Sequence, residues 1–172
     1  MGSVEFIIHR LKTCGSTNDV ARELAAAGAP GGTVVVADEQ TAGRGTKGRS
    51  WHSAPGLGLY VSFLLRPAPG KLALLPLAAG LAARDAVEKS HGLAARLRWP
   101  NDIVFDGRKL GGVLCESATA GCVPELAVVG IGVNMNHGPE DFPSDIRGAA
   151  TSIRAALGRP ADRAGFLDAL LA

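Results

Sequence analysis

Cysteine and net charge are both scarce in this sequence of 172 residues. The three cysteines, Cys14, Cys115 and Cys122, form no C-x-x-C pair, which excludes a disulfide framework and a zinc ribbon. An odd cysteine count without a secretory signal is typical of reduced thiols in a cytoplasmic protein. The formal net charge of +2 excludes a long basic surface, so we expect no DNA or RNA partner.

Long hydrophobic runs are absent as well. No apolar run approaches the ~20 residues that a membrane-spanning helix needs. The first ten residues lack the apolar core and cleavage site of a signal peptide, and Phe6 breaks the myristoylation pattern that Met1 and Gly2 open. With 47% hydrophobic and 20% charged residues, the composition is that of one globular domain over residues 1–172 without a membrane partner.

The order of the predicted elements indicates an α+β fold. Strands are expected over residues 6–11, 31–40, 58–67, 95–100 and 125–136, and a hairpin over residues 103–117 turns at Asp106-Gly107. Helices are expected over residues 17–28, 71–91 and from 162 onward. Strands that pair as hairpins, with helices in separate blocks, predict a mixed, largely antiparallel sheet with helices packed on it.

Particular residues mark where these elements should begin and end. Ser16 and Asp19 match the S-x-x-D capping box at the start of the first helix. Gly92 is a predicted C-cap of the second helix, and Pro67 is expected to end the third strand.

The loop at residues 43–50, GRGTKGRS, differs by one residue from the P-loop pattern G-x-x-x-x-G-K-[ST], because Arg49 stands where the Lys belongs. A P-loop also needs a helix directly after its glycines, and Pro55 with its neighbouring glycines forbids one. A mobile surface loop and an anion-binding loop remain. Three cations and a Trp within these few residues favour the anion-binding loop.

The segment RWPNDIVFDGRKLGG places Lys109 just before two glycines. A solvent-exposed Lys is the ordinary interpretation at this position. Paired glycines in a strand also mark the close approach of a ligand, so Lys109 is a candidate contact for a phosphate or carboxylate. Asn101 and Asp102 fit either a simple turn or the same site.

Two further segments carry candidate binding residues. Gly130 and Gly132 alternate along one strand with Asn134, so all three face one side and leave a groove that could hold a flat ring. Structurally, the glycines could instead allow a bulge or tight packing. Ser16 and Thr17 at a helix start fit a simple cap, or a cluster of donors for a polar ligand.

Taken in order, these segments read S-T-N-D, E-Q-T-A-G-R-G-x-x-G-R-x-W, R-W-P-N-D, K-L-x-G-V-L-x-E and G-I-G-V-N. This order resembles the catalytic domain of biotin protein ligases over nearly the whole chain, from about Cys14 to Ile153. The resemblance implies a fold similar to the core of class II aminoacyl-tRNA synthetases. It also implies an ATP-dependent enzyme that converts biotin to biotinyl-5'-AMP and transfers it to a lysine of a biotin carboxyl carrier protein, as in acetyl-CoA carboxylase.

The resemblance also implies a role for each matching residue. Those expected at biotin are Ser16, Thr17, Asn18, Gln40, Gly43, Arg44, Gly45, Thr46, Lys109 and Gly112. Those expected at ATP or the adenylate are Arg44, Lys47, Arg49, Trp51, Asn101, Lys109 and Asn134. Lys109 and Arg44 are the expected catalytic residues, and Asp102 is a candidate contact for Mg²⁺.

Three departures from the family qualify these expectations. Many members carry Arg where this chain has Thr46, so retention of the adenylate is expected to be looser, with Lys47 as the nearest substitute. The helix-turn-helix of repressor-type members and the small C-terminal β-barrel domain have no counterpart in the sequence, which predicts no DNA binding and weakened turnover. Homodimers are common in the family, but no residue here defines an interface.

Two alternatives remain open. A lipoate–protein ligase shares the fold and the chemistry, although its usual R-R-x-x-G-G-G segment is missing here. A truncated biotin-binding domain with weak turnover is the other.

Overall fold

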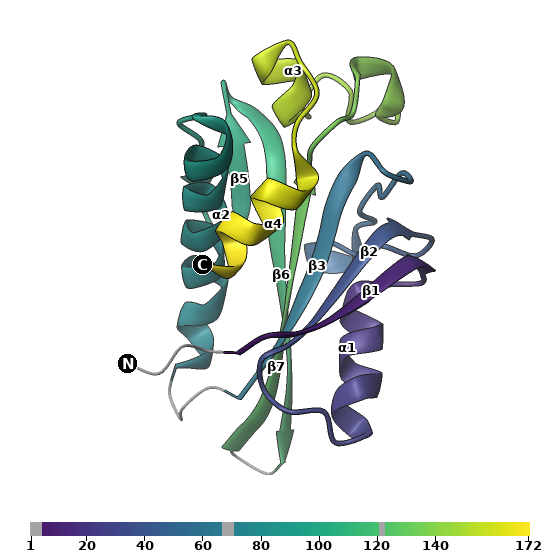
Figure 1. The fold of residues 1–172 in the computed structure, drawn as a ribbon, viewed down its shortest axis with the longest axis vertical. Helices are drawn as coiled ribbons and strands as arrows, with labels where there is room; N and C mark the ends of the chain where they lie inside the picture. Colours follow the sequence, from purple (N-terminus) through teal and green to yellow (C-terminus); the bar gives the residue numbers. More distant parts are fainter. Residues whose placement is uncertain (1–4, 67–70, 121–122) are drawn as a thin grey trace.

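The computed structural model describes residues 5–66, 71–120 and 123–172. The described residues form one seven-stranded sheet in the order β1-β2-β3-β7-β6-β5-β4 (Figure 1). The strands are β1 (Ile7–Cys14), β2 (Thr33–Gln40), β3 (Gly58–Leu65), β4 (Arg96–Arg98), β5 (Asp102–Phe105), β6 (Arg108–Ala120) and β7 (Val123–Asn134). The helices are α1 (Thr17–Ala26), α2 (Leu75–His91), α3 (Ile153–Leu157) and α4 (Arg163–Leu171), with 3-10 turns η1 (Thr46–Gly48), η2 (Leu72–Leu74) and η3 (Pro139–Asp141).

The strand directions confirm the predicted fold class. β1 and β2 are parallel and are joined through α1, since parallel neighbours need a crossover connection. The other neighbouring strands pair antiparallel. The sheet is therefore mixed and largely antiparallel.

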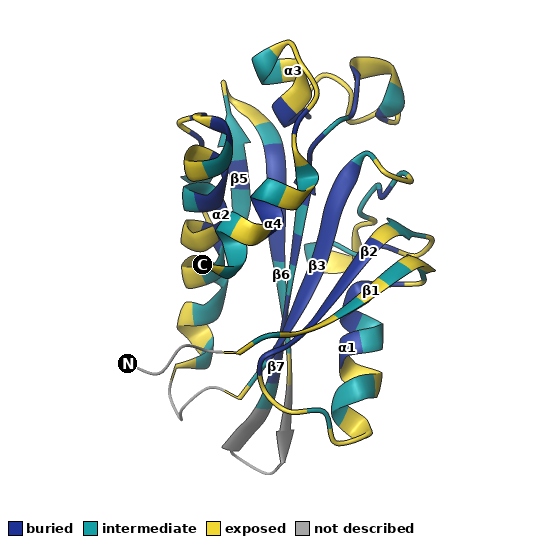
Figure 2. Ribbon diagram, viewed as in Figure 1, coloured by how far each residue is buried: buried dark blue, intermediate teal, exposed yellow. Residues whose placement is uncertain are grey.

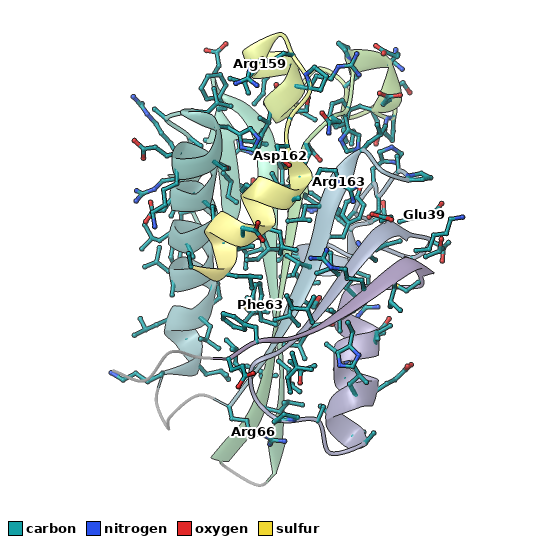
Figure 3. The ribbon with its side chains drawn as sticks, in the orientation of Figure 1. Glu39, Phe63, Arg66, Arg159, Asp162 and Arg163 are labelled. Carbon is teal, nitrogen blue, oxygen red and sulfur yellow. The ribbon has the colours of Figure 1, made fainter. Side chains whose placement is uncertain are left out.

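One face of the sheet is covered by α2 and α4, which lie side by side (Figure 1). Val61 of β3 and Val133 of β7 point to this face and pack with Phe166 of α4 in the main hydrophobic core. Arg163, labelled in Figure 3 at the start of α4, fixes this helix to the sheet. Its Nε donates to the carbonyl oxygen of Gly58 at 2.9 Å, and its Nη2 contacts Asp38 at 2.7 Å.

The opposite face is only partly covered, because α1 has just 10 residues. Ala21 of α1 packs on Val35, Leu64 and Val128 in a second, smaller core. Side chains alternate along a strand, so Ser62, two residues before Leu64, points to the same face as α1. Beyond the N-terminal start of α1, this face carries the candidate site.

Several turn predictions are confirmed. Asp106 (φ 48°) and Gly107 (φ 73°) both adopt positive φ, as the two central residues of a type I′ hairpin turn require. Gly92 ends α2 in the left-handed conformation with φ 68°. Pro76 lies in the first turn of α2, where no backbone donor is lost. Pro67 and Cys122 lie outside the described residues.

The predicted capping box at α1 is wrong. Ser16 occupies the N-cap position, but its side chain makes no capping hydrogen bond. The Asp19 carboxylate does not reach back to Ser16; it pairs with Arg44 and Arg22. Two nearby guanidinium groups are stronger partners for a carboxylate than a single neutral backbone N–H.

Burial rises from the edge of the sheet to its centre (Figure 2). β1 at one edge is mostly exposed or half-buried, whereas nearly all of β3 is buried. In the described part of the chain, no helix has both the length and the apolar character needed to cross a membrane.

Candidate active site

A cavity of about 290 Å³ opens on the face of the sheet that carries α1. Most of the residues predicted from the sequence line it: Ser16, Thr17, Asn18, Gln40, Arg44, Gly45, Thr46, Arg49, Trp51, Asn101, Asp102, Lys109, Gly112 and Asn134. Gly43 and Lys47, both described, are not part of its wall. Residues far apart in the sequence are therefore brought to one site.

At one end of the cavity, the first turn of α1 meets Gln40 at the end of β2. The Gln40 Oε1 accepts from the backbone N–H of Thr17 at 2.8 Å, and its Nε2 donates to Ser53 Oγ at 2.9 Å. A backbone N–H can only donate, so the Gln40 amide is fixed in this orientation. Gln40 thus ties the strand end to the helix start.

Ser62 is a residue of this site that the sequence analysis did not identify. Its side chain is fully buried on β3, with Oγ 2.7 Å from Thr17 Oγ1 and 2.6 Å from Asn18 Oδ1. The signal was a single serine inside the otherwise hydrophobic run LYVSFLL. A buried polar side chain needs a partner, and Ser62 finds two at the start of α1.

Glu116 on β6 was also missed as a site residue, although it closes the K-L-x-G-V-L-x-E motif. Its Oε2 accepts from Asn18 Nδ2 at 2.7 Å and lies 3.3 Å from Arg44 Nη2. Gly130 makes room for the Asn18 side chain, because a Cβ there would lie 2.4 Å from Asn18 Oδ1. Glu116 therefore joins the start of α1 to the glycine-rich loop.

The glycine-rich loop at residues 43–50 has the backbone that the sequence analysis predicted. It contains only the 3-10 turn η1, with Lys47 at φ 59°, and no helix follows it. The exclusion of a P-loop is confirmed. Gly43 is required by packing, since a Cβ would lie 2.6 Å from the Trp51 carbonyl oxygen and 2.7 Å from Ser53 Oγ.

Arg44 is held by two carboxylates at the cavity wall. Its guanidinium donates to Asp19 at 2.6 and 2.8 Å and lies 3.3 Å from Glu116. The hydrogen bond from Arg44 is the main reason that the pKa of Asp19 lies below its ordinary value. The hydrogen bond to Asp19, followed by the charge of Glu116, raises the pKa of Arg44 despite its partial burial. In this structure the positive charge of Arg44 is therefore balanced by the carboxylates of Asp19 and Glu116.

Trp51 lies against the backbone of β7, where the sequence analysis predicted a groove for a flat ring. A Cβ on Gly132 would lie 2.6 Å from Trp51 Cε2, and one on Gly112 would lie 3.3 Å from Cζ3. The flat ring over these glycines is the protein's own indole. Lys109 Nζ lies 5.2 Å from the centroid of this ring, within reach of a cation–π interaction.

Lys109 is fixed at both backbone groups and at its ammonium. Its N–H donates to Ala149 at 2.7 Å, and its carbonyl accepts from Thr151 at 2.9 Å. Its Nζ lies 2.6 Å from Asp102 Oδ1, while Arg98 Nη2 donates to Asp102 Oδ2 at 2.8 Å. Burial acts to raise the pKa of Asp102, but the hydrogen bonds from Lys109 and Arg98 outweigh it and lower the pKa.

The two remaining amides use their Nδ2 groups to hold the walls together. Asn134 Nδ2 donates to the Thr151 carbonyl at 3.0 Å, and Asn101 Nδ2 donates to the Val113 carbonyl at 2.7 Å. Their predicted contacts with ATP stay predictions. The same holds for the ligand contacts assigned to the other lining residues.

The sequence analysis did not single out two histidines here: His52 lines the cavity, and His137 lies behind its wall. His137 is fully buried and stacks on Phe142, with ring centroids 4.8 Å apart. The ring centroids of His52 and His137 are 5.9 Å apart. Burial first, and then the charge of His52, lower the pKa of His137 to about 4, against the opposing effect of Asp141. His137 is therefore neutral at physiological pH.

A mixed sheet with this loop and this cavity defines an α+β ligand-binding domain. The sequence profile of the Biotin/lipoate A/B protein ligase family matches residues 11–134, which include the loop and every strand that lines the cavity. The chain therefore belongs to the biotin/lipoate A/B protein ligase family, as the resemblance implied.

Relatives and solved structures agree with this assignment. The chain is 42% identical over 158 residues to the bifunctional ligase/repressor BirA of Bacillus subtilis, a match that covers 91% of this chain and 49% of BirA. It is 40% identical over 162 residues to the biotin--[acetyl-CoA-carboxylase] ligase of Paracoccus denitrificans, covering 90% of this chain and 66% of that protein. The structure of biotin protein ligase from Aquifex aeolicus in complex with biotin and ATP has a TM-score of 0.84 at 37% identity, covering 95% of this chain and 66% of that one. The chain thus spans about half the length of the Bacillus relative.

Proposed function

We propose that the chain is the catalytic domain of a biotin--[biotin carboxyl carrier protein] ligase. One observation carries the proposal: hydrogen-bonding groups of α1 and Gln40 and a set of cations line one and the same cavity. We call the first set the ureido end (Ser16, Thr17, Asn18 and Gln40, with Ser62 buried directly behind them) and the second set the cation end (Arg44, Arg49, Arg98 and Lys109). Arg44 connects the two sets, because it reaches Asp19 in the first turn of α1. Biotin has a ureido ring and a carboxylate, so each of the two sets finds a complementary group on the ligand. Biotin ligases among the relatives support the choice of ligand.

In the first half-reaction, a carboxylate oxygen of biotin attacks the α-phosphorus of ATP. The new bond between this oxygen and phosphorus forms as the α–β phosphate bond breaks, so pyrophosphate leaves and biotinyl-5'-AMP remains. No protein nucleophile is needed. Lys109 and Arg44 stabilise the negative charge that develops on the phosphate oxygens, and the walls hold the reactants in line.

To act on the ligand, the two catalytic cations exchange their partners. Lys109 is paired with Asp102 and Arg44 with Asp19, and each pair is partly exposed. An exposed pair such as Arg44–Asp19 contributes only about 0–1 kcal/mol, so it exchanges at little cost. The Lys109–Asp102 pair is more buried, so Lys109 leaves it only when a phosphate takes the place of the carboxylate. Trp51 flanks the adenine, and Asn134 contacts the edge of this ring. Arg49, Lys47 and Asn101 contact the phosphates.

Magnesium fits the cation end as an ion held mainly by phosphate oxygens. Asp102 is the carboxylate that lines the cavity beside Lys109. The described ranges contain no group of three or more His, Cys, Asp or Glu that could hold a metal. Because Mg²⁺ is commonly bound by one or two carboxylates together with substrate phosphates, Asp102 suffices as its protein contact. The ion would supply charge neutralisation on the phosphates.

In the second half-reaction, the ε-amine of a carrier lysine attacks the acyl carbon of the adenylate. An amide bond forms, the acyl–phosphate bond breaks, the amine loses its proton and AMP leaves. The intermediate is a mixed anhydride that water also hydrolyses. A loop at residues 43–50 that closes over it protects it until the carrier arrives.

Biotin-dependent exchange of radioactive pyrophosphate into ATP tests the proposal, with lipoate as the control ligand. We expect exchange with biotin and none with lipoate. Exchange with lipoate alone would identify a lipoate ligase. Tight biotin binding without exchange would identify a binding domain that is catalytically inert.

A further inference from the structure

A chain of hydrogen bonds runs from Glu116 on β6 to the ureido end of the cavity. Glu116 Oε2 contacts Asn18 Nδ2 at 2.7 Å, and Asn18 Oδ1 contacts Ser62 Oγ at 2.6 Å. Ser62 Oγ then contacts Thr17 Oγ1 at 2.7 Å. Asn18, Ser62 and Thr17 are each at most 4% exposed, so water does not replace these contacts.

Glu116 determines which group donates and which accepts at each step of this series of hydrogen bonds. This side chain lies between the guanidinium groups of Arg44 and Arg22, as a carboxylate would. A carboxylate can only accept hydrogen bonds, so Asn18 must turn its Nδ2 toward Glu116. Its Oδ1 consequently faces Ser62.

The same reasoning then fixes both hydroxyl protons. Asn18 Oδ1 only accepts, so Ser62 must give it the single hydroxyl proton that it has. The contact between Ser62 and Thr17 therefore needs the Thr17 proton. Thr17 Oγ1 also lies 3.1 Å from Gln40 Oε1, but no proton remains for a hydrogen bond between them. Gln40 Oε1 is already satisfied, because it accepts from the Thr17 N–H at 2.8 Å.

We propose that Glu116, Asn18 and Ser62 are positioning residues that fix Thr17 Oγ1 as a hydrogen-bond acceptor toward the cavity. The proposal rests on the proposed function, because it assigns the Thr17 oxygen to a ureido N–H of biotin. Ser16 lines the same end and makes no capping bond, so its hydroxyl is free to donate to the ureido carbonyl. The dithiolane ring of lipoate offers no N–H, and this end of the cavity therefore discriminates against it.

We call the hydrogen-bonded series Glu116–Asn18–Ser62–Thr17 the relay. Binding of matched ligands tests it. The ligands are biotin and the two carbamate analogues in which one ureido N–H is replaced by a ring oxygen. We expect the wild-type chain to bind one of the two analogues about 10- to 100-fold more weakly than biotin, because two acceptors then face each other. In Ser62→Ala the Thr17 proton is released and can be donated to the ring oxygen, so this ratio falls below about fivefold.

A second pair of variants tests the origin of the direction. Glu116→Gln and Glu116→Ala both remove the charge beside Arg44, but only Gln keeps an oxygen that accepts from Asn18. We expect Glu116→Gln to keep most of the wild-type ratio and Glu116→Ala to lose it. Ser90→Ala is the control, because it removes a hydroxyl from α2 that does not line the cavity and is not part of the relay. It leaves the ratio unchanged.

The outcomes separate the relay from the proposed function. A wild-type chain that binds none of the three ligands would overturn the proposed function. Tight biotin binding with equal affinity for both analogues would overturn the relay alone. So would an unchanged ratio in Ser62→Ala, or equal losses in the two Glu116 variants.

Discussion

The two ends of the cavity are built on different principles. At the ureido end, neutral groups such as Thr17, Ser62 and Asn18 satisfy one another through short hydrogen bonds in a buried place. At the cation end, Arg44 and Lys109 are held by carboxylates at a partly exposed wall. The first end is complete before a ligand arrives, whereas the second must exchange its partners.

This difference separates recognition from catalysis. A buried network of neutral hydrogen bonds is rigid and selective, because any unmatched group costs the full desolvation penalty. Ion pairs at a partly exposed wall open more easily, and the more exposed Arg44–Asp19 pair opens more easily than the Lys109–Asp102 pair. Variants at the ureido end should therefore change affinity and selectivity, and variants at the cation end should change the rate.

The largest effect is expected for Lys109→Ala. We predict a loss of about 10²- to 10³-fold in the biotin-dependent exchange rate, because Lys109 acts on charge that develops in the transition state. The Kd for biotin, measured by calorimetry, should change less than about threefold. The control Lys89→Ala, at an exposed position on α2, should behave as wild type. Equal losses of rate and affinity would contradict this role.

A pair of glycine variants distinguishes the ureido end from the wall that Trp51 forms. The Cβ of Gly130→Ala would lie 2.4 Å from Asn18 Oδ1, and that of Gly132→Ala 2.6 Å from Trp51 Cε2. Overpacking of this kind costs about 1–3 kcal/mol, or roughly 5- to 150-fold. We expect Gly130→Ala to raise the Kd for biotin and Gly132→Ala to raise the KM for ATP in the exchange assay. Identical profiles for the two variants would show that the ends are not separate.

A smaller effect is expected for Arg44→Ala. Removing this loop cation should release biotinyl-5'-AMP about tenfold faster, because one charge-assisted contact to the intermediate is lost. Stopped-flow fluorescence of Trp51 can follow the release. Arg22→Ala is a matched control, since Arg22 contacts Asp19 and Glu116 but does not line the cavity. If both variants release at the wild-type rate, Arg44 does not hold the adenylate.

The smallest effect concerns acid stability. The folded pKa of Asp19 lies below the ordinary value of 3.8, so its pairing contributes stability above that pH and loses it as the pH falls further. Denaturant unfolding at pH 5 and pH 3 should show that Asp19→Asn loses less stability than wild type, by under about 1 kcal/mol.

Ser62→Ala provides the contrast, because it titrates nothing. The difference in unfolding free energy between Ser62→Ala and the wild type should be the same at pH 5 and pH 3. A pH-dependent loss in Ser62→Ala would show that the ureido end also depends on charge.

Local signals in the sequence were sufficient for much of the fold. Asp106-Gly107 can form a tight hairpin turn, and Gly92 can end a helix, whatever surrounds them. Lys109 was identified because it stands beside a pair of glycines in a strand. Thr17 was identified because it stands at a helix start. These inferences needed no knowledge of distant partners.

The missed residues depend on partners that are far away along the chain. Asn18 and Glu116 are 98 residues apart, and Asn18 and Ser62 are 44 residues apart. Asp19 was interpreted as a cap because its nearest neighbours allow one, but Arg44, 25 residues later, is the stronger partner. A periodic pattern shows which face a side chain occupies, and the sheet order decides what it meets there.

The order of the sheet also has a consequence for how the chain folds as it is synthesised. β7 follows the other six described strands in the chain, yet it lies between β3 and β6. Until it is made, the β1–β3 and β4–β6 portions each present an open edge, which is prone to pairing with other chains. When β7 pairs with both edges, Gly130 and Gly132 arrive opposite Ser62 and Gly112. The sheet and the part of the cavity that lies on β7 are therefore completed in one and the same step.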